Sequence, residues 1–105
     1  EALLDRFPVT IQMDYLPFDV EVEVTIQQSG NSDKALVERM VRVANDVREA
    51  MRNEKIFSSF STRRLIDWAR MAAHFDPMEA AASTIFSKVN PFDAKVIEDI
   101  LDNHF

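Results

Sequence analysis

Apolar side chains recur at intervals of three and four along most of the chain, which is the pattern of amphipathic helices. The longest run covers residues 33–53, with Ser32 as a plausible N-cap and Asp33 in the first turn. Its apolar positions are Leu36, Val37, Met40, Val41, Ala44, Val47 and Met51. The pattern therefore predicts one long helix over residues 33–53.

Three further helix starts follow, each marked by a polar capping residue. Ser61 or Thr62 can cap a helix whose apolar stripe is Leu65, Trp68, Ala69 and Ala72. The pairs Asp76-Pro77 and Asn90-Pro91 open two more helices, because proline suits a first turn whose N–H groups have no helical partner. About four helices with short connections predict a mainly α fold, a small helical bundle packed around the apolar stripes.

The start of the chain has a different pattern. Residues 9–15 alternate apolar and polar side chains, which is typical of a short strand with one buried face. A lone strand leaves backbone groups unpaired along both edges and is marginal in water. We therefore expect this strand to be an orphan whose sheet lies outside the chain, so that the chain is a fragment of a larger protein.

The segment between this strand and the long helix is ambiguous. Valines at every second position of residues 17–26 favour a strand. Asp19 as a cap and the only glycine, Gly30, as a stop favour a helix over residues 19–29. On the residues alone, the strand is favoured.

Composition narrows the class of protein. A chain of 105 residues with 47% hydrophobic content has enough material for one compact domain. The net charge of −6 argues against nucleic-acid binding, which depends on clustered Lys and Arg. No apolar stretch approaches the ~20 residues of a membrane span, and the absence of cysteine is compatible with the cytoplasm. A single glycine excludes a phosphate-binding Gly-rich loop within these residues.

Two arginines stand out because of where they fall. Arg63 and Arg64 lie in a predicted first turn, where the helix dipole disfavours an exposed cation by roughly 0.3–1 kcal/mol. Asp67, four residues after Arg63, could hold it in a surface pair worth only about 0.3–0.5 kcal/mol. Alternatively, the guanidinium and the first-turn N–H groups together await an oxyanion. The residues alone leave both interpretations open.

Other candidates are less informative. Arg6 follows Asp5 and either pairs with it at a helix end or projects from an inter-subunit surface toward a phosphate, which its fork of donors suits. His74 and His104 have no metal-ligand spacing, and no nucleophile–base arrangement supports an enzyme acting through His74.

Three stretches together resemble a known family. They are EALLDRFPVTIQMDYLP at the start, FSTRRLIDWAR over residues 60–70, and VIEDILDNHF at the end. Their order is similar to the C-terminal part of an AAA+ ATPase of the MoxR-like branch, which includes the cobaltochelatase small ATPase subunit and the nitric oxide reductase and Rubisco activators.

The resemblance implies a division of the chain and roles for two residues. Residues 1–30 would end the nucleotide-binding core, with its last strand at about 9–15, and residues 31–105 would form the helical lid. In similar proteins the segment after the strand is helical, and we follow that for residues 19–29. Arg63 would be the sensor arginine that reaches the γ-phosphate of ATP, and Arg6 the arginine finger offered in trans to a neighbouring subunit.

The same resemblance implies which other parts of the ATPase belong to the full-length parent protein. The P-loop, the Mg-binding acidic strand and the first sensor would lie upstream of Glu1, so this fragment alone should not hydrolyse ATP. ATP and Mg would belong to the full-length parent, a homo-oligomeric ring, hexameric in the family, that remodels or activates a partner protein. The rival hypothesis is a free-standing acidic helical interaction module whose arginines only make surface pairs.

Overall fold

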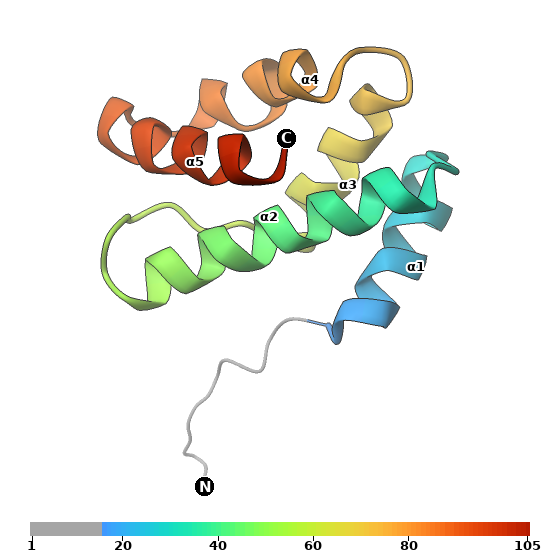
Figure 1. The fold of residues 1–105 in the computed structure, drawn as a ribbon, viewed down its shortest axis with the longest axis horizontal. Helices are drawn as coiled ribbons and strands as arrows, with labels where there is room; N and C mark the ends of the chain where they lie inside the picture. Colours follow the sequence, from blue (N-terminus) through green and yellow to red (C-terminus); the bar gives the residue numbers. More distant parts are fainter. Residues whose placement is uncertain (1–15) are drawn as a thin grey trace, which may run out of the picture.

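The computed structural model describes residues 16–105, and its helices enclose one hydrophobic core (Figure 1). Within this range the elements are α1 (Phe18–Ser29), α2 (Lys34–Arg52), α3 (Thr62–Ala72), α4 (Pro77–Thr84), the 3₁₀ turn η2 (Phe86–Lys88) and α5 (Pro91–His104). The described part contains no strand, which confirms the predicted mainly α bundle. The strand predicted at residues 9–15 lies outside the described residues, and so does Arg6.

Polar caps start the helices as the sequence indicates, with two exceptions. The prediction of Asp19 as a cap is wrong, because α1 begins at Phe18 after Pro17 without a side-chain cap, and Asp19 lies within its first turn. The side chains of Ser61, Asp76 and Asn90 each accept a hydrogen bond from a first-turn N–H group. For α2, however, the cap is Asp33, whose Oδ1 accepts from the N–H of Leu36 at 3.2 Å. The prediction of Ser32 as N-cap is therefore wrong by one residue, because Asn31 Oδ1 accepts from the N–H of Asp33 at 3.1 Å and the helix begins only after Asp33.

Residues 18–29 form a helix, so the strand favoured by the alternating valines is wrong and the helix implied by the family resemblance is confirmed. The buried residues of α1 are Glu21, Val22, Thr25 and Ser29. They are spaced by one, three and four, while Val20 remains 45% exposed. The helical period was concealed because polar residues occupy much of the buried face. Gly30 ends the helix with φ 78°, a left-handed conformation that glycine adopts without strain.

α2 is the central helix and packs against α1, α3 and α5, while α4 packs on α3 (Figure 1). Trp68 of α3 is fully buried, as predicted, and stacks edge-on with Phe60 and Phe105. Its indole N–H donates to the carbonyl of Pro77 at 2.9 Å.

Val22 of α1 belongs to the same hydrophobic core as the buried residues of the later helices. α1 therefore shares a core with the helices of residues 31–105. The assignment of residues 1–30 to a nucleotide-binding core stays a prediction.

A buried carboxylate on α5 fastens the long connection between α2 and α3. Asp93 accepts hydrogen bonds from the hydroxyl and N–H of Ser58, at 2.6 and 2.9 Å, and from the N–H of Phe57. The Ser58 hydroxyl, helped by these backbone groups and by Asn90, holds the pKa of Asp93 below its ordinary value, against the opposing effect of burial. The loop before α3 is thus tied to the first turn of α5.

This contact makes stability depend on pH in the acid range. Because the folded pKa of Asp93 is lower than the unfolded value of about 3.9, the unfolded chain binds more protons there, and the stabilisation is lost as the pH falls through the folded pKa. We expect Asp93→Asn to melt below wild type near neutral pH, with a gap that narrows below about pH 4. Thermal unfolding followed by circular dichroism at several pH values measures this gap.

The matched control is Glu49→Gln. Arg52 also lowers the pKa of Glu49, but both side chains of that pair are more than half exposed. The melting temperature of Glu49→Gln should therefore stay close to that of wild type at every pH. A gap for Asp93→Asn that stays constant down to pH 2 would contradict the proposed role of the Asp93 carboxylate.

Candidate functional site

Arg63 lies in the first turn of α3, is exposed, and makes no hydrogen bond or ion pair with any described residue. The surface pair with Asp67 does not form, because Asp67 is bound by Arg70 at 3.3 Å instead. Arg64 is also accounted for, since its Nη1 donates to the carbonyl of Ser59 at 3.1 Å. Of the two adjacent arginines, only Arg63 has a guanidinium available for a ligand within the described part of the chain.

The start of α3 adds to the positive character around Arg63. Ser61 Oγ accepts from the N–H of Arg64, and the carbonyl of Ser61 accepts from the N–H of Leu65. The N–H groups of Thr62 and Arg63 come before the first intrahelical bond and so have no partner within the helix. A free guanidinium beside unpaired first-turn N–H groups is an arrangement that suits a phosphate oxygen.

A buried ion pair lies directly behind this turn. Arg48 of α2 binds both carboxylate oxygens of Glu21 of α1, at 2.8 and 2.7 Å, and the two side chains are 2% and 0% exposed. The Nε of Arg48 donates to the carbonyl of Phe60 at 2.8 Å, and the hydroxyl of Thr62 donates to Glu21 at 3.0 Å. Residues on both sides of the cap Ser61 are therefore held by one ion pair.

Sequence reasoning missed Glu21 and Arg48, although each carried a signal. Arg48 follows Val47 and falls four residues after Ala44, on the apolar stripe of α2. A charged residue on a buried stripe needs a partner of opposite charge, because burial of a lone charge is costly. The partner could not be identified while residues 19–29 were ambiguous, since Glu21 joins the buried face only if that segment is helical.

The other sequence candidates do not gather into a second site. His74 is exposed, and His104 places Nε2 2.7 Å from Asp46 Oδ2. Between residues 16 and 105 no cluster of three His, Cys, Asp or Glu side chains could hold a metal ion. None of the helices in this range is long and apolar enough to cross a membrane.

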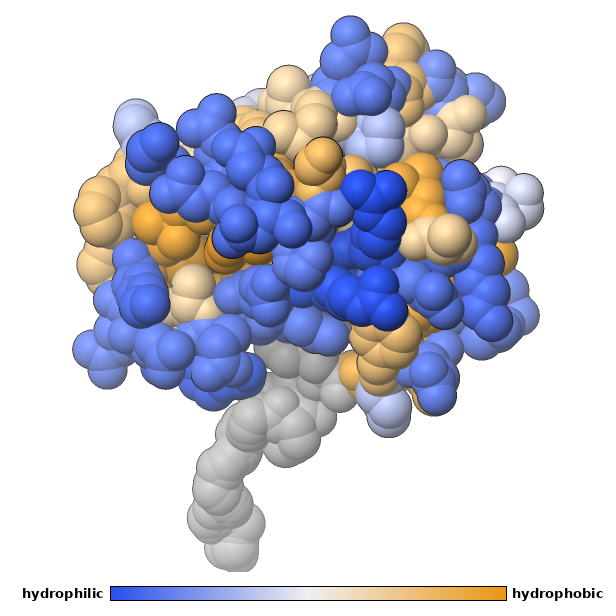
Figure 2. All heavy atoms as spheres, viewed as in Figure 1, coloured by the Kyte–Doolittle hydropathy of each residue, from blue (hydrophilic) through white to orange (hydrophobic). Residues whose placement is uncertain are grey.

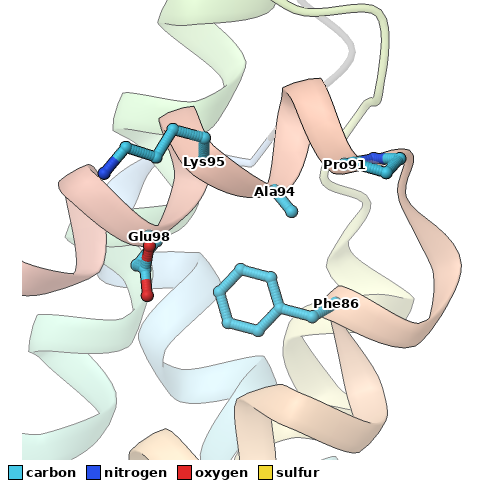
Figure 3. A pocket seen from close by; sticks show the side chains of 5 residues that line it. All are labelled: Phe86, Pro91, Ala94, Lys95 and Glu98. Atoms are coloured by element: carbon cyan, nitrogen blue, oxygen red, sulfur yellow. The ribbon is translucent and has the colours of Figure 1, made fainter.

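The surface has several hollows, and one beside α3 has polar side chains in its lining, among them Asp67, Arg70 and Lys88. The hollow in Figure 3 has a volume of about 440 Å³, and the ring of Phe86 projects into it from η2 toward Ala94 and Glu98 of α5. Figure 2 shows a largely hydrophilic face with hydrophobic side chains between the charged ones. Phe57 and Phe92 are the most exposed apolar residues described, at 85% and 64%. The site with the clearest chemistry remains the start of α3.

Comparison with known proteins decides the family. The CbbQ/NirQ/NorQ C-terminal family matches residues 21–103, most of the chain and all of its helical core. The chain belongs to the CbbQ/NirQ/NorQ C-terminal family. This membership confirms the resemblance to the C-terminal part of a MoxR-like AAA+ ATPase.

Individual relatives of this CbbQ/NirQ/NorQ C-terminal domain agree with that placement. The aerobic cobaltochelatase subunit CobS of Sinorhizobium sp is 30% identical over 90 residues, which are 82% of this chain and 27% of CobS. An uncharacterized protein of Staphylococcus saprophyticus is 33% identical over 90 residues, 85% of this chain and 34% of that protein. YojN of Bacillus subtilis, also uncharacterized, is 30% identical over 91 residues, 86% of this chain and 30% of its own length.

The CbbQ/NirQ/NorQ C-terminal domain thus spans about a third or less of the curated relatives it matches. No solved structure matches the chain significantly. The match begins at residue 21, within α1, and includes Arg63 together with the buried pair behind it. Arg6 precedes the matched region.

Proposed function

We propose that this chain is the helical lid, with the adjoining end of the core, of an AAA+ ATPase that couples ATP binding and hydrolysis to the remodelling or activation of a partner protein. In this proposal Arg63 contacts the γ-phosphate of bound ATP and ties the position of the lid to the nucleotide state. ATP and Mg would be bound mainly by parts of the parent protein that precede this chain. The fragment alone would not hydrolyse ATP.

One observation carries the proposal. The guanidinium of Arg63 is exposed and unpaired among the described residues, in a helix turn that disfavours a cation unless an anion is present. A phosphate oxygen there would bind both the side chain and the first-turn N–H groups. The residues present therefore fit a nucleotide phosphate, and membership in a MoxR-like AAA+ family is what leads us to propose ATP.

ATP bound in the parent would supply the transferable phosphoryl group. The protein's own residues position and neutralise the charge on its oxygens, which is most of the catalysis in phosphoryl transfer. Arg63 would act from the same subunit. Arg6 would reach the ATP of a neighbouring subunit, which requires a homo-oligomeric ring, proposed to be a hexamer in the full-length parent.

The test is ATP turnover by the full-length parent protein carrying Arg63→Ala. Removal of one preorganised donor to the phosphate is expected to lower kcat by about 10²–10³-fold. ATP should also bind more weakly while ADP, which lacks the γ-phosphate, binds as in wild type. Steady-state turnover together with equilibrium binding of both nucleotides measures these effects.

Arg70→Ala is the matched control, because it removes the same charge from the far end of α3, where the exposed Arg70 pairs with Asp67 and donates to the carbonyl of Gln28. Its turnover should stay within about fivefold of wild type. If Arg63→Ala turns over and binds ATP like Arg70→Ala, the lid assignment fails and the acidic helical interaction module becomes the better explanation.

A further inference from the structure

The buried pair behind α3 suggests how Arg63 is aimed. We infer that Glu21, fixed by Arg48, is the positioning residue for Arg63, and that it acts through the hydroxyl of Thr62 at the first position of α3. The inference rests on the proposed function, since it assigns a means of holding the arginine that the proposal places on the phosphate.

The carboxylate of Glu21 has a well-defined position. Two guanidinium N–H groups of Arg48 bind its two oxygens at 2.8 and 2.7 Å, in the bidentate geometry that gives both strength and direction. Arg48 is itself held by the carbonyl of Phe60 at 2.8 Å and by Asn45 Oδ1 at 2.9 Å. Both members of the pair are almost completely buried, so neither can swing without losing several hydrogen bonds at once.

The fixed carboxylate then holds the residue next to Arg63. Thr62 Oγ1 donates to Glu21 Oε2 at 3.0 Å, across a separation of 41 residues in the sequence. The hydroxyl is not needed for capping, because Ser61 already caps the helix. Since the Arg63 side chain makes no hydrogen bond or ion pair with the described residues, the protein positions it through the backbone next to Thr62.

This junction also joins three helices at one buried point. Glu21 comes from α1, Arg48 from α2, and Thr62 begins α3. Movement of α1 against α2 would break the desolvated ion pair, and movement of α1 against α3 would break the hydrogen bond from Thr62 to Glu21, so the junction resists both displacements.

The experiment compares three substitutions in the full-length parent: Thr62→Val, Thr62→Ser and Thr25→Val. Thr62→Val keeps the shape and removes the hydrogen bond, and Thr62→Ser restores the hydroxyl. Thr25→Val is the matched control, because the Thr25 hydroxyl is buried on α1 and has no hydrogen-bond partner among residues 16–105. Turnover, the ratio of ATP to ADP affinity and the melting temperature are measured for each.

We expect Thr62→Val to lower turnover and the ATP-to-ADP affinity ratio by roughly tenfold, since misplacement of a catalytic contact by 1 Å can cost on the order of 100-fold. Thr62→Ser should recover most of this loss, and Thr25→Val should behave like wild type. In an Arg63→Ala background, Thr62→Val should have no further effect on turnover, because its action passes through that arginine.

The possible failures are distinguishable. If Arg63→Ala is impaired but Thr62→Val behaves like Thr25→Val, the positioning role is overturned and the proposed function stands. If Thr62→Val lowers turnover equally with and without Arg63, the hydroxyl serves only the stability of the fold, and the inference is again overturned. If Arg63→Ala itself behaves like wild type, both the proposed function and this inference fail.

Discussion

Replacement of Arg48 by methionine is expected to destabilise the domain by about 3–5 kcal/mol, because it leaves the carboxylate of Glu21 buried with only the Thr62 hydroxyl as a described partner. Loss of one member of a buried pair leaves an uncompensated buried charge. The free-energy cost of that charge is larger than the net stabilisation that the intact pair provides. For a domain of this size the change corresponds to a melting temperature lower by more than about 10 °C. Thermal and urea unfolding of the chain measure the effect.

The control for this prediction lies one turn further along the same helix. Arg52 also pairs with a glutamate, Glu49, but both side chains are more than half exposed, so Arg52→Met should cost less than about 1 kcal/mol. The double variant Glu21→Leu with Arg48→Met should recover most of the stability, because it removes both charges together. Equal losses for Arg48→Met and Arg52→Met would contradict the energetic importance of the buried pair.

The second large effect concerns Arg6 and depends on the parent assembly. As an arginine finger acting in trans, Arg6 is expected to accelerate turnover by about 10³–10⁵-fold, so Arg6→Ala in the full-length protein should lose most of its activity. Arg6→Lys should also remain strongly impaired, because an ammonium group lacks the planar fork that binds two phosphate oxygens. Steady-state turnover of purified rings measures both variants.

Mixing of subunits tests whether the arginine acts on a neighbour. Subunits that cannot bind ATP but retain Arg6 are added to Arg6→Ala subunits, which bind ATP but lack the finger. Partial recovery of turnover is expected, since each mixed interface joins an intact finger to an intact nucleotide. The finger role is excluded if the mixture stays inactive or if Arg6→Ala alone is as active as wild type.

Much of the helical fold could be predicted, because local sequence signals mark where α2, α3, α4 and α5 begin. Their starts carry capping side chains, and two of them carry proline as well, so the boundaries follow from short-range chemistry. α1 was different. Its buried face contains the polar residues Glu21, Thr25 and Ser29, so the spacing of apolar residues favoured a strand, and the helix was indicated by Gly30 as a stop and by the family resemblance.

The candidate site was predicted only in part for the same reason. The position of Arg63 in a first turn was evident from the cap and the apolar stripe that follows. The sequence did not show that Arg63 would lack a pair with Asp67, because Arg70, three residues further along the helix, binds that carboxylate instead. The contacts of Glu21 with Arg48 and with Thr62 join residues 27 and 41 positions apart, and such tertiary pairing leaves no local pattern.

The burial of Trp68 gives the chain its own optical reporter. It is the only tryptophan among the 105 residues, and its ring lies edge-on against Phe60, whose carbonyl is bound by Arg48. Tryptophan emission depends on the polarity around the indole, so a shift to longer wavelength would register water reaching the base of α3. Fluorescence of the unlabelled chain can therefore follow loosening of the helix that carries Arg63, without any dye attached near that arginine.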